Sequence, residues 1–163
     1  GVAHSFPGKI GFESIDETEN KKSCMVANPS MYKLTIPRQL YVEPRFIIKL
    51  AITTLMSKLN KIRSIVDGND DDFYSNDYME ITRLESSTRF KIIGETYTIG
   101  NALFRFAFLT DPTVDDLFCV KKHPSHKHIF VEIHHPDAKK VMLGAIDRFK
   151  AELEAVKTGL NLS

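Results

Sequence analysis

The stretch ETYTIGNALFRF, residues 95–106, decides the fold of this chain. Thr98 is suited to cap the N-terminus of a helix, because its hydroxyl can accept a hydrogen bond from a backbone N–H two or three positions on. Leu103 and Phe106 belong to an apolar run that predicts burial on more than one side of the helix. Gly100 costs about 0.5–1 kcal/mol relative to Ala in a helix. We therefore expect either a close approach by another backbone at Gly100 or, as the simpler alternative, a capped core helix with a tolerated Gly.

Strands are predicted on both sides of this helix, which itself is expected over residues 99–109. TRFKIIG (88–94), DLFCV (116–120) and HIFVEIH (128–134) have strand composition, and the last alternates apolar residues on one face. MYKLTIPRQLYV (31–42) alternates in the same way until a Pro interrupts it. The chain therefore belongs to the α+β class.

Two long amphipathic helices are also predicted, one in each half of the chain. Pro44 suits the first turn of one, Pro136 opens the other, and Gly68 and Gly159 are placed to end them. Apolar residues recur every three or four positions, so the helices are suited to pack against each other or against a partner. The two stripes comprise Ile48, Ile52, Leu55, Leu59, Ile62 and Val66, and Val141, Ala145, Phe149, Leu153 and Val156.

An acidic segment separates the two halves. DGNDDDFYSND, residues 67–77, replaces the apolar periodicity with acidic and turn-forming residues, so we expect a solvated linker there. The sequence begins without an initiator Met, and its first residues are typical of the interior of a fold. We therefore expect further residues upstream.

Composition excludes several classes of protein. The formal charge of +1 does not indicate a nucleic-acid coat, and no apolar run reaches the roughly 18 residues of a membrane span. Cys24 and Cys119 are far apart, which favours reduced thiols in an intracellular compartment.

The order of these elements, with a K-x-H-P segment at 121–124, resembles the small alpha-like subunit of cellular multisubunit RNA polymerases, the archaeal L subunit and its eukaryotic relatives. That family opens the motif helix with E-D-H-T-L-G-N. Here the Glu, Thr, Gly and Asn are kept, Ile replaces Leu, and Thr96 and Tyr97 depart from the pattern. The resemblance covers about residues 88–158.

Residues 1–66 are similar to the C-terminal part of the larger alpha-like subunit. With 67–80 as linker and 81–163 as the small alpha-like dimerisation domain, the arrangement is similar to fused subunits in polymerases of some large DNA viruses. The resemblance implies a small β-sheet packed on long amphipathic helices. It also implies a scaffold without catalytic residues, metal or cofactor, which pairs alpha-like regions and docks the large catalytic subunits.

Such a scaffold would meet DNA and RNA only through the complex and would bind no membrane. Its location would be intracellular: the virion or host cytoplasm for a viral protein, the nucleus for a cellular eukaryotic one. The interface residues implied are Glu95, Thr98, Ile99, Gly100, Asn101, Leu103, Phe106, His123 and Pro124, with Ile52, Leu55, Leu59, Ile62, Phe149 and Leu153 from the long helices.

Two other classes stay open as alternatives. The first is a small metal-binding hydrolase that uses the His-rich segment His123–His135 and Glu132, although H-E-x-x-H spacing is lacking. The second is a nucleic-acid-binding module, for which basic residues of the first half, among them Lys58, Lys61 and Arg63, lack interleaved aromatic residues.

Overall fold

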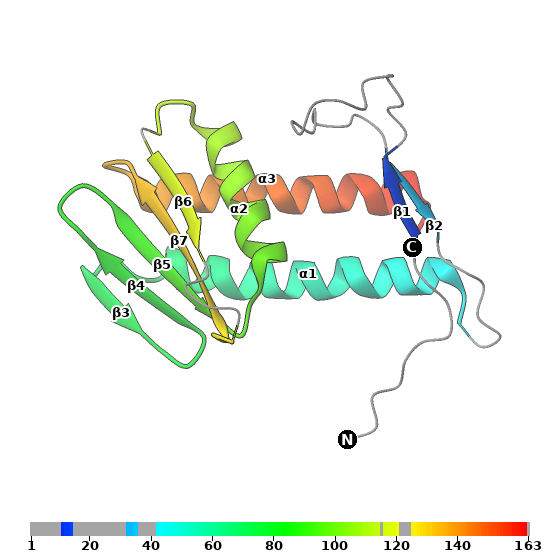
Figure 1. The fold of residues 1–163 in the computed structure, drawn as a ribbon, viewed down its shortest axis with the longest axis horizontal. Coiled ribbons are helices and arrows are strands. Elements are labelled where there is room, and N and C mark those ends of the chain that lie inside the picture. The colour runs from blue at the N-terminus through cyan, green and yellow to red at the C-terminus, as the bar shows by residue number, and fades with distance from the viewer. Residues whose placement is uncertain (1–10, 15–31, 36–41, 115, 121–124, 163) are drawn as a thin grey trace. The chain divides into compact units, whose positions relative to one another are not determined.

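The computed structural model describes residues 11–14, 32–35, 42–114, 116–120 and 125–162 (Figure 1). The chain divides into two compact units, Gly1–Leu50 and Ala51–Ser163. The elements in chain order are β1 (Gly11–Ser14), β2 (Tyr32–Thr35), α1 (Pro44–Asp67), β3 (Phe73–Ser75), β4 (Met79–Arg83), β5 (Thr88–Ile93), α2 (Tyr97–Thr110), β6 (Asp116–Val120), β7 (His128–His134) and α3 (Ala138–Gly159).

The first unit contains one antiparallel strand pair and the first turns of α1. β1 pairs with β2, with Phe12 opposite Leu34. β2 confirms part of the strand predicted over 31–42, whose other residues up to 41 lie outside the described ranges. Helix α1 begins at Pro44, as predicted.

The second unit is built on a five-stranded antiparallel sheet with the order β3-β4-β5-β7-β6. Its register places Ile81 opposite Phe90, Phe90 opposite Val131, and Val131 opposite Cys119. Alternate residues are buried along β4, β5 and β7, which makes one face of the sheet apolar. The three strands predicted after residue 87 are confirmed.

The prediction of a linker over 67–80 is wrong for part of that segment. β3 and the first residues of β4 form a hairpin at the edge of the sheet, and the side chain of Asn76 accepts hydrogen bonds from the backbone N–H groups of Tyr78 and Met79 in its turn. Met79 is fully buried, and Tyr74 packs against the core. These apolar residues order the segment, while its acidic side chains remain at the surface.

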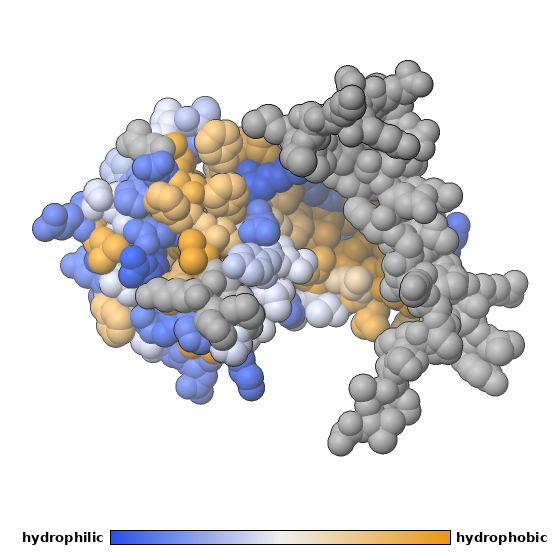
Figure 2. All heavy atoms as spheres, viewed as in Figure 1, coloured by the Kyte–Doolittle hydropathy of each residue, from blue (hydrophilic) through white to orange (hydrophobic). Residues whose placement is uncertain are grey.

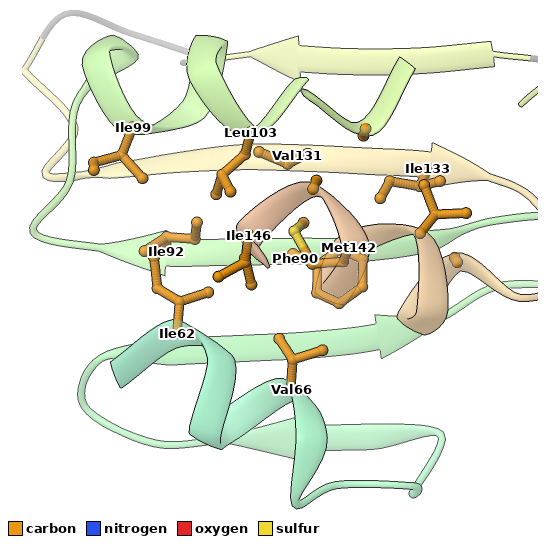
Figure 3. Packing of buried hydrophobic residues seen from close by; sticks show 14 of the residues in the cluster. Ile62, Val66, Phe90, Ile92, Ile99, Leu103, Val131, Ile133, Met142 and Ile146 are labelled. Atoms are coloured by element: carbon orange, nitrogen blue, oxygen red, sulfur yellow. The ribbon is translucent and has the colours of Figure 1, made fainter. Parts of the chain in front are cut away.

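Three helices supply the other side of the core. Figure 3 shows Ile62 and Val66 of α1, Leu103 of α2 and Met142 of α3 pointing toward the apolar face of β5 and β7. From Leu55 to Val66 and from Val141 to Leu153 the predicted apolar stripes are thus confirmed as core-facing, whereas Val156 is exposed. Helix α1 ends at Asp67, directly before Gly68 as predicted, although among the described glycines only Gly94 has a left-handed φ. Within the described ranges, no helix combines the length and apolar character needed to cross a lipid bilayer.

Helix α2 begins earlier than predicted. Its N-cap is Thr96, with no side-chain capping bond, and Thr98 lies exposed inside the first turn. The capping role predicted for Thr98 is therefore wrong.

Gly100 is crowded by side chains and not by a second backbone. A Cβ atom at this position would lie 2.3 Å from Cδ1 of Ile129 and 2.8 Å from Sγ of Cys119, so β7 and β6 press directly on the first turns of α2. Burial also raises the pKa of the Cys119 thiol to about 11, which keeps it a neutral packing group. The missing side chain of Gly100 therefore allows helix and sheet to meet.

Replacing Gly100 with Ala is expected to lower the free energy of unfolding by about 1–3 kcal/mol, because Ile129 is fully buried and has little room to move. Urea unfolding would measure the change. Gly159→Ala is the control, since a Cβ there meets nothing within 4 Å, and it should be neutral or slightly stabilising. Equal effects of the two substitutions would contradict this account of Gly100.

Candidate functional site

The helices of the second unit carry apolar side chains on faces turned away from the core. On α2, Tyr97, Phe108 and Leu109 are exposed, as are Val156 of α3 and Leu160 directly after it. Figure 2 shows apolar residues gathered over α2 and along α3 on the side seen in that view. Large apolar residues exposed on helices are typical of surface that a partner covers.

This helical surface rests on a rigid base. Helices α2 and α3 pack directly against each other, and the rings of Phe106 and Phe149 stack with their centroids 5.1 Å apart. A Cβ atom at Gly144 of α3 would lie 2.6 Å from Cγ2 of Thr110, so the two helices approach closely there too. The exposed apolar residues are thus held at fixed positions relative to the sheet.

The motif residues divide between core and surface. Ile99, Gly100 and Leu103 are buried against the sheet of their own domain. Thr98 and Asn101 are exposed on the opposite side of α2, and Phe106 is partly buried. His123 and Pro124 lie outside the described residues. A direct contact with a partner remains a prediction for the exposed members, while the buried ones support the helix that carries them.

The predicted seam residues of the long helices also lie in the core of the second unit. Ile52, Leu59, Ile62 and Phe149 are buried, and Leu55 and Leu153 are partly buried against the same cluster. The stripe of α1 therefore packs on the domain that follows it in the chain.

A polar network that the sequence analysis did not predict joins α1 to the start of α2. The carboxylate of Glu95 is 5% exposed; it accepts a hydrogen bond from Nζ of Lys58 at 2.9 Å and another from the hydroxyl of Tyr78 at 3.1 Å. Burial, and then the charge of Glu95, raise the pKa of Tyr78, so its hydroxyl stays a donor. Nζ of Lys61 lies 3.8 Å from the centroid of the Tyr78 ring. No local pattern marks Lys58, because it is 37 positions from its partner.

The His-rich segment does not form a convergent ligand set in the part of the chain that the structure describes. Nε2 of His134 lies 3.4 Å from Glu132, whereas Nε2 of His135 lies 3.6 Å from Asp111. Among the described residues, no group of three or more His, Cys, Asp or Glu side chains is placed to hold a metal ion. Glu132 instead accepts hydrogen bonds from Arg89 at 2.7 Å and Ser87 at 2.8 Å.

Three of the basic residues considered for nucleic-acid binding are engaged within the domain. Besides Lys58 and Lys61, Arg63 donates a hydrogen bond through Nε to Oδ1 of Asp147 at 2.9 Å. These three cations therefore serve contacts of α1 with neighbouring elements, which does not favour a phosphate-binding surface.

These features define a class of protein: an α+β domain whose sheet is covered on one face by helices, and whose helices expose a second apolar face for association. Residues 87–159 match the family model described as the RNA polymerase Rpb3/Rpb11 dimerisation domain. Residues 87–159 are thus similar to the dimerisation domain of alpha-like RNA polymerase subunits, which confirms the resemblance seen in the sequence. The match spans β5 to α3 and leaves α1 outside it. No curated protein matches the chain.

Glu132 is expected to make stability depend on pH. Burial of its carboxylate raises the pKa, but the hydrogen bonds from Arg89 and Ser87 outweigh burial and hold the pKa below the ordinary value of 4.5. A lowered pKa means that the ionised form stabilises the fold above about pH 4.5, and that this stabilisation is lost as the pH falls through the folded value.

The measurement is urea unfolding of wild type and Glu132→Gln between pH 7 and pH 3. Wild type should be more stable by about 1 kcal/mol at pH 7, and the difference should shrink below about pH 4.5. Glu154→Gln removes an exposed contact with Lys157 and serves as the control. A difference that is constant with pH would refute the role given to Glu132.

The purified protein is expected to contain no stoichiometric zinc, because the described His and Glu residues pair with different neighbours and do not converge. Elemental analysis after dialysis would measure this. About one zinc per chain, lost on substitution of His134 or His135, would revive the hydrolase alternative.

Proposed function

We propose that this chain is a non-catalytic scaffold that docks the two large catalytic subunits of a DNA-directed RNA polymerase and works without a metal or cofactor of its own. The family match supports a role in polymerase assembly and pairing with another alpha-like region. We also propose that the chain contacts particular large subunits directly and that it acts inside the cell.

The observation that carries this proposal is the exposed apolar face of α2 and α3. Burying a large apolar side chain contributes about 1.5–3 kcal/mol, so residues such as Phe108, Leu109 and Val156 would together favour a stable complex. The face lies within the residues that match a dimerisation domain.

Helix α1 supports the idea that one alpha-like region is supplied by the same chain. It lies outside the family match, yet Leu59, Ile62 and Val66 enter the core of the matched domain. A helix from a larger alpha-like region would pack in this way. The first 66 residues are therefore proposed to be part of such a region.

The sheet offers a second surface for docking. Phe118 and Val120 of the edge strand β6 are exposed on the face opposite the helices, since Cys119 between them faces the core. We propose that a large subunit docks there while the helices hold the alpha-like partner.

Phe108→Asp is expected to prevent assembly while leaving the domain folded, because the side chain is 55% exposed and the substitution puts a charge into the proposed interface. The chain would be co-expressed with the other polymerase subunits of its genome. The yield of purified complex and the nucleotide incorporation per assembled complex would be measured. A loss of yield of at least tenfold, with normal activity in any complex that forms, is expected.

The matched control is Phe73→Asp on the edge strand β3, where the Phe side chain is 61% exposed and lies outside the family match. This variant should assemble at the wild-type level. If Phe108→Asp assembles normally but the complex is inactive, the scaffold proposal is wrong and a role in catalysis or nucleic-acid binding must replace it.

A further inference from the structure

The apolar stripe of α1 does not by itself determine the register of this helix, which here means its position along its own axis relative to the rest of the domain. Its spacing repeats with the period of a heptad, so a shift of seven residues places Ile52 where Leu59 was and Leu59 where Val66 was. Such a shift rotates the helical face by only about 20°. The core positions of Leu59, Ile62 and Val66 would then still hold apolar residues, namely Ile52, Leu55 and Leu59.

The connection after α1 is also permissive. Residues 68–72 lead to β3 and are held by the ion pairs Lys139–Asp70 and Arg83–Asp72, in which both acidic partners are highly exposed. Exposed pairs of this kind contribute little. A shift of seven residues moves the helix by about 10 Å, and five extended residues can span about 17 Å.

Glu95 does distinguish the registers. Its carboxylate is buried, and Lys58 is the cation that neutralises it, with Tyr78 completing its hydrogen bonds. In the shifted register Ala51 takes the place of Lys58, and its methyl group cannot neutralise a carboxylate. A buried carboxylate without a cation is strongly unfavourable.

We propose that the Lys58–Glu95 pair is the specificity determinant that sets the register of α1 on the dimerisation domain, while the apolar stripe supplies the burial. The domain thereby selects a helix that carries a cation at this one position. This inference does not depend on which polymerase subunits the chain docks.

The test measures the register directly in the full chain. Ser57 and Lys140 are exposed on α1 and α3, and each is replaced by Cys to carry a spin label, with Cys24 and Cys119 changed to Ser. Pulsed electron paramagnetic resonance then gives the distance between the labels. A shifted register moves position 57 by about 10 Å along α1 and adds a second distance.

The decisive variant is Lys58→Met with Glu95→Gln, which removes both charges and leaves no buried ion. It is expected to fold and to show a second distance population. The control is Arg63→Met with Asp147→Asn, which removes an exposed ion pair between α1 and α3, the two labelled helices, and should keep the single wild-type distance. A double variant at 58 and 95 that keeps the single distance would overturn the proposal. Failure of that variant to fold would also overturn it, because the stripe would then not hold α1 alone.

A second measurement uses the unfolding equilibrium. Lys58→Met alone leaves Glu95 buried without its cation, so its equilibrium constant for unfolding should exceed that of the double variant by at least tenfold. Equal constants would show that the two residues are not coupled and would contradict the proposal.

Discussion

The structure depends on covering one apolar face of a five-stranded sheet. Phe90, Val131 and their neighbours turn that face toward the helices, and no single helix is wide enough to cover it. Helices α2 and α3 contact part of it, and the C-terminal turns of α1 complete the cover with Ile62 and Val66. Because α1 is needed for this cover, the element outside the family match is a structural part of the domain.

The motif around Gly100 illustrates how one short segment serves two surfaces. Its buried members let α2 approach the strands closely, which fixes the height and angle of the helix over the sheet. The opposite side of the same helix carries Phe108 and Leu109 outward. The position of the association surface therefore follows from internal packing, and residues without any partner contact can still determine it.

The fold was predictable wherever apolar spacing repeats over a whole element, as in β7 and in the stripe from Ile52 to Val66. The β3–β4 hairpin was missed because acidic composition dominates its sequence, while the residues that order it, such as Met79, depend on strands further along the chain. The Lys58–Glu95 contact was missed for a related reason. Its partners are distant in sequence, and a single Lys beside an apolar stripe looks like an ordinary solvated residue.

The short connection between α1 and β3 keeps the two elements that it joins available in fixed proportion. When two elements share one chain, their encounter is intramolecular, with an effective concentration that does not fall when the protein is dilute. Residues 68–72 connect α1 to the domain on which it packs, so the contact between them is intramolecular. The helix and the domain are therefore always made in equal numbers, and neither can be titrated away by a surplus of the other.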